Sequence, residues 1–247
     1  MAAWNNGKVV GRKQWSKTLY SLYVESDIAP FEAGQFIKMG LEIKGEILGR
    51  PYSLVNPPDS RPLEIYYTHV PDGRLTSQLI QLKPGDDIFV APRAHGFLIL
   101  SELPKADHLW LMATGTGVGP FISMLATETP WQHYKKTVLV YAARTFSELS
   151  YQEHISNILA KHAEQFIFIP FLSRETKDNA LHGRIPQAII DGTLEVHAAI
   201  NISAENSQIM LCGNPQMVKD TSKVLNDRGL KKHRRVEPGH ITIENYW

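Results

Sequence analysis

Four consecutive residues, Arg50-Pro51-Tyr52-Ser53, combine side chains that suit one kind of ligand. An arginine guanidinium can bind phosphate through two parallel hydrogen bonds, and a tyrosine ring offers a flat face for stacking. The serine hydroxyl adds one donor or acceptor beside them. A ligand with a pyrophosphate, a planar ring and a reactive ring nitrogen fits this set. The alternative is an arginine at a strand edge followed by a buried tyrosine, because so short a motif is weak evidence alone.

A glycine-rich segment, Thr-Gly-Thr-Gly-Val-Gly-Pro at 114–120, follows an apolar run and precedes a helical stretch. Glycines let a backbone approach a pyrophosphate closely, and the start of a helix supplies amides without partners. Pro120 suits the first helical turn, where its missing N–H costs nothing. In this strand–turn–helix context the segment predicts a nucleotide site that includes Gly115, Thr116 and Gly117.

Three arginines follow the strands predicted downstream of this segment. Arg144 ends the second strand as Ala143-Arg144, Arg174 ends the third as Ser173-Arg174, and Arg184 comes shortly after. An NAD site usually has an acidic residue for the ribose after its second strand, whereas a 2′-phosphate needs an arginine. A solvated loop residue is the ordinary interpretation of each arginine alone. As a set, they favour NADPH over NADH.

The segment Leu211-Cys-Gly-Asn-Pro215 ends the fourth predicted strand as the glycine-rich segment ends the first. We therefore expect Cys212, Gly213 and Asn214 to lie where a nicotinamide binds. Cys212 has no visible His/Asp partnership, so a contact role is favoured over that of a nucleophile. A buried structural cysteine is an equally good interpretation.

Short strands separated by Gly and Pro account for the first hundred residues. One short helix is expected over 75–80, after the turn Pro71-Asp72-Gly73. This order indicates a small antiparallel barrel or sandwich. The expected strands are Lys8–Val10, Leu19–Val24, Gln35–Leu41, Tyr52–Val55, Leu63–Thr68 and Asp87–Ala91.

Strands and helices alternate in the remainder of the chain, which predicts a doubly wound parallel sheet. The change falls at residues 101–107, so we expect one domain over 1–101 and a second over 108–247. The expected strands are His108–Ala113, Thr137–Ala142, Phe166–Leu172 and Gln208–Cys212. The expected helices are Phe121–Glu128, Tyr151–His162, Pro186–Asp191 and Pro215–Arg228.

Composition narrows the class of protein. A formal net charge of +1 argues against general nucleic-acid binding, which needs a basic surface. The single cysteine excludes an internal disulfide framework and suits a reducing compartment, so we expect a cytoplasmic protein. We expect no signal peptide, no membrane span and, because the ten histidines show no ligand spacing, no metal site. Nothing in the sequence demands an oligomer, so a monomer is expected.

Taken together, these motifs resemble the ferredoxin–NADP⁺ reductase superfamily, and specifically the bacterial ferredoxin/flavodoxin–NADP⁺ reductases. The resemblance spans essentially the whole chain. It implies a six-stranded antiparallel FAD-binding barrel joined to a five-stranded parallel NADP-binding domain. It also implies an enzyme that moves electrons between NADPH and a one-electron carrier by hydride transfer at flavin N5. The motifs that carry it are Arg50–Ser53, Tyr66–His69, Asp72–Thr76, Gly115–Pro120, Ala143-Arg144, Ser173-Arg174, Leu211–Pro215 and Glu244–Trp247.

The resemblance also implies roles for individual residues. Arg50 neutralises the FAD pyrophosphate, Tyr52 stacks on one flavin face, and Ser53 lies near N5. The other implied FAD contacts are Pro51, Tyr66, Tyr67, Thr68, His69, Arg74, Leu75, Thr76, Thr116, Tyr246 and Trp247. The implied NADP contacts are Gly115, Thr116, Gly117, Ala143, Arg144, Ser173, Arg174, Arg184, Cys212, Gly213 and Asn214. The implied catalytic residues are Ser53, Cys212, Glu244 as a proton relay, and Trp247.

Trp247 is expected to cover the flavin face opposite Tyr52, where nicotinamide must bind. We therefore expect its removal to tighten nicotinamide binding and to weaken the preference for NADPH.

The expected partner is an acidic ferredoxin or flavodoxin, since the chain encodes no carrier centre of its own. The basic run Lys231–Arg235 is a candidate for steering such a partner, although a solvated basic face is an even alternative. An NADPH-dependent free-flavin or ferric-siderophore reductase is the second enzyme interpretation, and it would turn over without a protein carrier. A non-catalytic redox-sensing module is a third, and it would be colourless or not bleached by NADPH.

Overall fold

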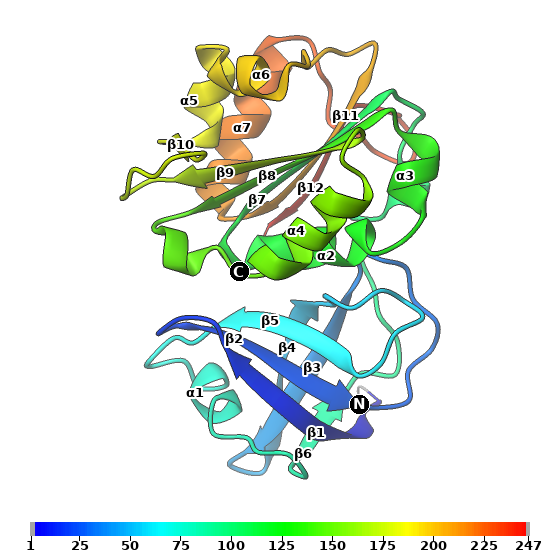
Figure 1. Cartoon of the computed structure of the whole chain (residues 1–247). Helices are drawn as coiled ribbons and strands as arrows, with labels where there is room; N and C mark the ends of the chain where they lie inside the picture. The colour runs from blue at the N-terminus through cyan, green and yellow to red at the C-terminus, as the bar shows by residue number, and fades with distance from the viewer. Residues whose placement is uncertain (1–2, 246–247) are drawn as a thin grey trace. The chain divides into compact units, whose positions relative to one another are not determined.

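The computed structural model describes residues 3–245, and their contacts divide the chain into two compact units (Figure 1). The first unit holds the chain up to Ile99 together with Gly119–Thr127, and the second holds Leu100–Val118 and the chain from Glu128 onward. Helix α2 (Gly119–Leu125) thus belongs by its contacts to the first unit. The hydroxyl of Ser123 on this helix donates a hydrogen bond of 2.8 Å to the carbonyl of Asn56.

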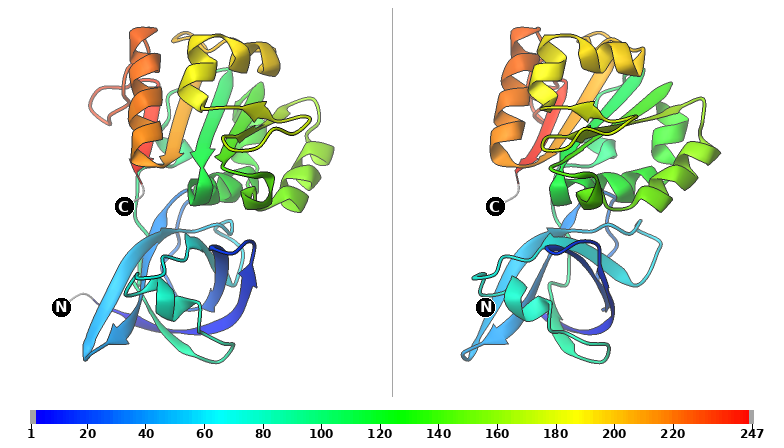
Figure 2. Two further views of the ribbon diagram at one scale, coloured as in Figure 1. Left: turned by 90° about the vertical axis from the view of Figure 1, so that its left-hand side faces the viewer. Right: turned by 60° about the vertical axis from the view of Figure 1, so that its left-hand side comes forward.

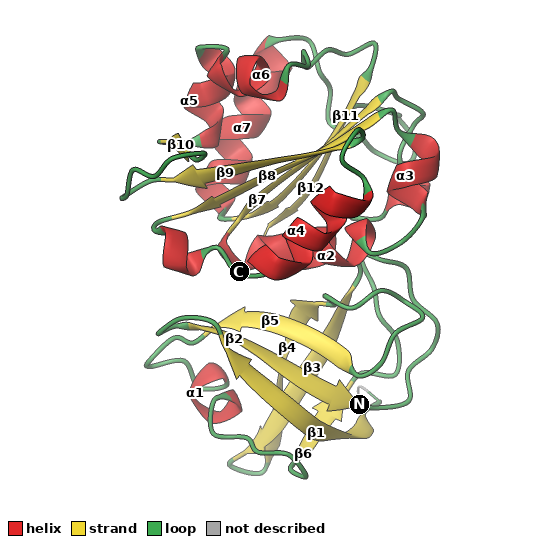
Figure 3. Cartoon of the chain, in the orientation of Figure 1, coloured by secondary structure: helices red, strands yellow, loops and turns green. Residues whose placement is uncertain are grey.

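The first unit is a six-stranded sheet in which every neighbouring pair is antiparallel, as predicted (Figure 3). The strand order is β4-β3-β6-β1-β2-β5, and the sheet curls into a barrel (Figure 2). Between the end strands β4 and β5 the barrel is joined by an isolated bridge, Leu54–Ile65. The elements are β1 (Asn5–Gln14), β2 (Leu19–Glu25), β3 (Phe36–Ile43), β4 (Glu46–Ser53), β5 (Leu63–Thr68), β6 (Asp87–Val90) and the short helix α1 (Thr76–Leu79).

Strand β4 begins at Glu46, six residues before the predicted start at Tyr52. It pairs with β3 through a two-residue turn in which Lys44 has φ 56° and Gly45 has φ 83°. Two consecutive positive φ values match the turn that best follows the twist of a hairpin. Lysine is not a typical residue for such a turn, and so the sequence did not reveal the hairpin.

The second unit is a parallel sheet of six strands, so the expected count of five is wrong. The two outermost strands explain the difference: β10 has only two residues, and β12 alternates apolar and polar residues at an edge. Neither shows the continuous apolar run that marks a buried parallel strand. The order is β10-β9-β8-β7-β11-β12, formed by β7 (His108–Thr114), β8 (Lys136–Ala143), β9 (Phe166–Leu172), β10 (Leu181–His182), β11 (Ser207–Gly213) and β12 (Ile241–Asn245).

Helices cover both faces of this sheet (Figures 1 and 2). Helix α4 (Gln152–Lys161) lies on one face, and α5 (Ile185–Ile190), α6 (Thr193–Ala198) and α7 (Pro215–Asp227) lie on the other. The core under the second group includes Trp110 and Phe171, both fully buried. Helix α6 and the short helix α3 (Thr129–His133) were not predicted. Among residues 3–245, no helix has the length and apolar character to cross a membrane.

Candidate nucleotide-binding site

The three predicted arginines follow three adjacent strands of the second unit. Arg144 directly follows β8, Arg174 comes two residues after the end of β9, and Arg184 comes two residues after the end of β10. Because the strands are parallel and neighbours lie about 4.8 Å apart, their carboxyl ends place these residues along one edge of the sheet. The backbone amide of Arg174 donates a hydrogen bond of 2.9 Å to the carbonyl of Arg144. All three side chains are exposed, so the edge carries cations that are accessible to a phosphate.

The glycine-rich segment lies beside this edge and forms a turn, Gly115–Val118, between β7 and α2. Its glycines have different requirements. A Cβ on Gly117 would stand 2.5 Å from the carbonyl oxygen of Cys212, so close packing against β11 demands glycine there. Gly115 has φ +54°, and a Cβ built on it would meet no atom within 4 Å. The open side of the turn is therefore at Gly115, and it suits a pyrophosphate.

This turn lies between β7 and β11, where the order of strands reverses direction along the sheet. Ligands of doubly wound sheets bind at such a point, outside the carboxyl ends of the strands. Thr116 is buried within the turn, so its side chain is not on the open surface.

Asn214 joins helix α7 to the end of strand β7. Its Oδ1 accepts hydrogen bonds from the amides of Gln216 at 2.9 Å and Met217 at 3.3 Å, and so caps helix α7. The backbone amide of Asn214 donates a hydrogen bond to Thr114 Oγ1 at 2.8 Å. Gly213 has φ +130°, a conformation that L side chains rarely adopt.

Two of the predicted catalytic residues are neighbours in the sheet. Cys212 on β11 pairs in register with Glu244 on β12, so their side chains lie on the same face. Cys212 is fully buried and Glu244 is half-buried. The structure thus brings these two together, while Tyr246 and Trp247 lie outside the described residues.

In the first unit, aromatic rings meet at the seam between β4 and β5. The rings of Tyr52 and Tyr67 contact edge to face with centroids 6.2 Å apart. By strand alternation Arg50 shares the face of Tyr52, and its side chain is exposed. Burial raises the pKa of both phenols, with Arg50 opposing the shift at Tyr52. Both tyrosines are consequently neutral at any ordinary pH.

Tyr67 has a buried hydroxyl with no hydrogen-bond partner among the described residues. Its ring also stacks on Tyr20 at a centroid distance of 6.0 Å. A buried hydroxyl normally has a partner, because leaving it unpaired costs about 1–3 kcal/mol. The exposed guanidinium of Arg50 and the half-buried ring of Tyr52 offer instead a phosphate donor and a stacking face on one side of β4, and so the barrel residues fit FAD.

The run Tyr66–His69 does not present one surface. Tyr67 points into the barrel core, whereas Tyr66 packs edge to face against Trp15, outside that core, at 6.4 Å. A single ligand on one side of the strand can therefore contact only alternate side chains of this run. The ring of His69 packs edge to face against Tyr20 at 6.3 Å, and Thr68 is half-buried on the opposite side of the strand from Tyr67. Alternation likewise puts Pro51 and the buried Ser53 on the face opposite Tyr52.

The turn before α1 is held by hydroxyl groups. Thr76 Oγ1 accepts from the amide of Val70 at 3.1 Å and donates to its carbonyl at 3.3 Å. The Ser77 hydroxyl donates to the carbonyl of Pro71 at 2.8 Å. Arg74 and Leu75 complete this turn, and the first amides of a helix have no intrahelical acceptor. The Thr76 side chain thus fixes the turn, which leaves backbone amides as the groups that suit a phosphate.

The sequence did not point to the acidic residues that support the arginine-bearing loops. Glu148 Oε2 accepts a hydrogen bond of 3.0 Å from the amide of Arg144, and Glu175 Oε2 accepts one of 2.7 Å from the amide of Phe146. No regular spacing marks either residue, because each acts through a loop. No cluster of three or more His, Cys, Asp or Glu that would hold a metal occurs within residues 3–245.

Comparisons with known proteins agree with both units. Residues 12–94 match a family model described as oxidoreductase FAD-binding domain, and residues 111–223 match one described as oxidoreductase NAD-binding domain. The chain is 44% identical to a flavodoxin/ferredoxin–NADP reductase of Escherichia coli (strain K12), with both chains covered completely. It is 35% identical to a ferredoxin–NADP reductase of Pseudomonas aeruginosa, over 96% of this chain and 95% of that one.

A solved structure shows the same fold. It is a ferredoxin NADP⁺ reductase from Neisseria gonorrhoeae with bound FAD and NADP, 28% identical to this chain. It aligns with a TM-score of 0.94 and complete coverage of both chains.

Proposed function

Because this chain belongs to the family of flavodoxin/ferredoxin–NADP reductases, we propose that it transfers electrons between NADPH and a ferredoxin or flavodoxin. FAD, when bound, supplies the chemistry that links the two-electron donor to the one-electron carrier. The protein contributes binding, orientation and exclusion of water. The observation that carries the proposal is the placement of Arg144, Arg174 and Arg184 after three adjacent strands.

The barrel residues are proposed to hold FAD. Arg50 is a bidentate donor for the pyrophosphate, and the backbone amides at Arg74, Leu75 and Thr76 add further donors. Tyr52 supplies a neutral ring for stacking. Pro51, Ser53, Tyr66, Thr68 and His69 complete the proposed set.

The edge of the parallel sheet is proposed to hold NADPH. Gly115 gives the pyrophosphate room, and Gly117 lets the turn approach β11. The three arginines take the 2′-phosphate, with Ala143 and Ser173 at the ends of their strands. Cys212 and Glu244 are proposed to serve the nicotinamide end, the first as a contact and the second as a proton relay. Trp247 is also assigned to the nicotinamide end, and that assignment rests on the family resemblance alone.

A comparison of NADPH with NADH tests the proposal. We expect Arg144→Ala and Arg174→Ala each to raise the KM for NADPH at least tenfold, because a charge-assisted phosphate contact contributes about 1.5–3 kcal/mol. The kinetics with NADH, which lacks the phosphate, should be unchanged. Steady-state reduction of a one-electron dye gives both constants. An unaltered NADPH constant in both variants would refute the assignment.

We propose that the electron carrier contacts only part of the basic segment 231–235. Arg235 Nε is 3.0 Å from Glu102 Oε1, and Arg234 is bound through its backbone to Glu237 in a tight turn. Lys231 and Lys232 are exposed. We expect Lys231→Glu with Lys232→Glu to slow carrier reduction at low ionic strength and to flatten its salt dependence, because steering is electrostatic. Stopped-flow mixing with an acidic flavodoxin measures it, and equal rates would remove this surface from the proposal.

The domain limits 1–101 and 108–247, a cytoplasmic setting and a monomeric enzyme belong to the same proposal. The lone cysteine suits a reducing compartment. Full turnover of NADPH with free flavin or a ferric siderophore, and none with ferredoxin or flavodoxin, would instead favour a free-flavin or siderophore reductase.

A further inference from the structure

The turn that follows Arg144 is fixed to its own strand. It contains the 3₁₀ segment Phe146–Glu148. The hydroxyl of Tyr141 on β8 donates to the carbonyl of Glu148 at 3.3 Å and accepts from the amide of Ser150 at 3.4 Å. The side chain of Glu148 accepts from the amide of Arg144 at 3.0 Å. This turn is thus a firm support at the end of β8.

The loop that carries Arg174, residues 173–180, is attached to this support by side chains. The ammonium of Lys177 lies 3.2 Å from the centroid of the Phe146 ring. Glu175 Oε2 accepts a hydrogen bond of 2.7 Å from the amide of Phe146. Both contacts converge on one residue, and they join the loop after β9 to the turn after β8.

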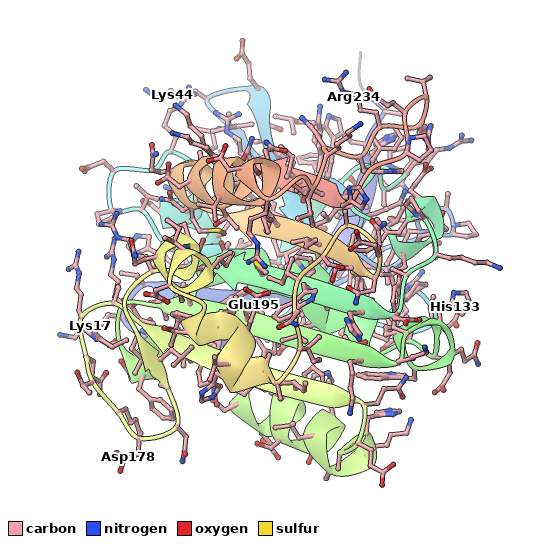
Figure 4. The ribbon with its side chains drawn as sticks, turned by 90° about the horizontal axis from the view of Figure 1, so that it is seen from above. Lys17, Lys44, His133, Asp178, Glu195 and Arg234 are labelled. Atoms are coloured by element: carbon pink, nitrogen blue, oxygen red, sulfur yellow. The ribbon has the colours of Figure 1, made fainter. Side chains whose placement is uncertain are left out.

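The loop has little other support toward its tip. Asp178 lies at that tip (Figure 4), and Asn179 has φ 63°. At the base, His182 Nδ1 lies 3.1 Å from the carbonyl of Glu175. Lys177 is exposed, so an unattached lysine would be free to turn into solvent, whereas here it covers a half-buried ring.

Recognition of a phosphate by two arginines depends on their spacing, since a guanidinium binds in a fixed planar geometry. Arg144 belongs to the support and Arg174 to the attached loop. The backbones of the two arginines are already joined, because the amide of Arg174 donates a hydrogen bond of 2.9 Å to the carbonyl of Arg144. A side-chain contact further along both segments therefore limits how far the rest of the loop, and with it the Arg174 guanidinium, can turn away from Arg144.

We propose that the Phe146–Lys177 contact, assisted by Glu175, positions Arg144 and Arg174 for the 2′-phosphate of NADPH. This inference rests on the proposed function and adds two residues to it. Phe146 and Lys177 act through the arginines and are positioning residues.

A double-mutant cycle tests the inference on the FAD-loaded enzyme. Phe146→Leu removes the ring, and Lys177→Met keeps the aliphatic stem but removes the charge. We expect each variant to raise the KM for NADPH about two- to fivefold, as much as an exposed cation–π contact contributes. We expect kcat and the KM for NADH to be unchanged. The double variant should match the single variants, because both remove the same contact.

A binding measurement without turnover gives a second readout. Calorimetry with adenosine 2′,5′-bisphosphate should show the same two- to fivefold weakening in both variants, and 5′-AMP should bind them as it binds the wild type. Phe146→Tyr and Lys177→Arg retain the contact and should behave like the wild type. Lys135→Met removes an exposed lysine that precedes β8, at the end of that strand opposite to Arg144, and it controls for the loss of one charge.

Several outcomes would overturn the inference. If Lys177→Met binds NADPH more weakly and Phe146→Leu binds it as the wild type does, Lys177 acts through its charge alone. Additive effects of the two substitutions on the KM for NADPH would also contradict the inference. An equal weakening of 5′-AMP binding would contradict it as well. If Arg174→Ala abolishes the NADPH preference while Phe146→Leu and Lys177→Met have the same KM for NADPH as the wild type, the inference fails and the proposed function stands. A wild type without that preference would refute both.

Discussion

Single residues of this protein divide into those that the fold requires and those that are open to a ligand. Gly117 and Gly115 illustrate the division, because they lie in one turn yet have opposite surroundings. The first is packed against the backbone of β11, and the second faces open space. The same glycine pattern in the sequence therefore contains two unrelated requirements.

Alanine substitution should separate them. We expect Gly117→Ala to destabilise the protein by about 3 kcal/mol or more, because its Cβ would stand 2.5 Å from a backbone oxygen that cannot move aside. Gly115→Ala should cost only about 1 kcal/mol, for the positive φ, yet weaken NADPH binding. Urea unfolding and nucleotide titration measure the two effects. Equal destabilisation by both substitutions would contradict this assignment.

Tyr67 is open to test through its unpartnered hydroxyl. We expect Tyr67→Phe to leave the stability of the FAD-free protein unchanged or slightly higher, because it removes a buried polar atom. Tyr23→Phe is the comparison, because it removes a hydroxyl that is hydrogen-bonded to Glu64, and it should lower the stability by about 1 kcal/mol. Urea unfolding of both variants measures the difference. A loss of stability in Tyr67→Phe as large as that in Tyr23→Phe would contradict this assignment.

At the scale of elements, helices α6 and α7 are joined by one ion pair. Glu195, labelled in Figure 4, binds Arg228 through two contacts, Nη1–Oε2 at 2.7 Å and Nη2–Oε1 at 2.8 Å. The two side chains also bind the backbone of Ile202. The Glu195 side chain is only 11% exposed, so the carboxylate depends on its partner.

Stability should consequently depend on Glu195 at neutral pH and not in acid. Burial raises the pKa of Glu195, but hydrogen bonds from Arg228 and Ile202 outweigh it, and the net pKa lies below the ordinary 4.5. The contribution is thus complete above about pH 4.5 and is lost as the pH falls through the lower folded value. We expect Glu195→Gln to cost about 2 kcal/mol at pH 7 and much less at pH 3. Urea unfolding at both pH values measures it, and a difference that stays constant would contradict it.

At the scale of the whole molecule, two units with separate cores serve two nucleotides. The cluster around Leu22 and Ile65 belongs to the first unit, and the cluster around Trp110 and Phe171 to the second. Each unit therefore has its own source of stability, and we propose that each binds its own nucleotide.

Ligand-dependent unfolding should reveal this division. We expect FAD at a hundred times its dissociation constant to stabilise the first unit by about 2.7 kcal/mol. Adenosine 2′,5′-bisphosphate should stabilise the second unit in the same way. Hydrogen exchange followed by mass spectrometry resolves the two, with 5′-AMP as the control. Protection by FAD confined to the second unit would contradict the assignment of the barrel.

The sequence alone determined the two fold classes and most of the central strands, and the residues of both nucleotide motifs remain its prediction. Continuous apolar runs mark buried strands, and glycine, proline and arginine mark turns and phosphate sites locally. What the tertiary structure decided lies in contacts between distant segments. Only the order of strands brings Arg144, Arg174 and Arg184 to one edge, and only packing distinguishes Gly117 from Gly115. The Phe146–Lys177 contact joins two loops of no regular pattern, so no local signal could predict it.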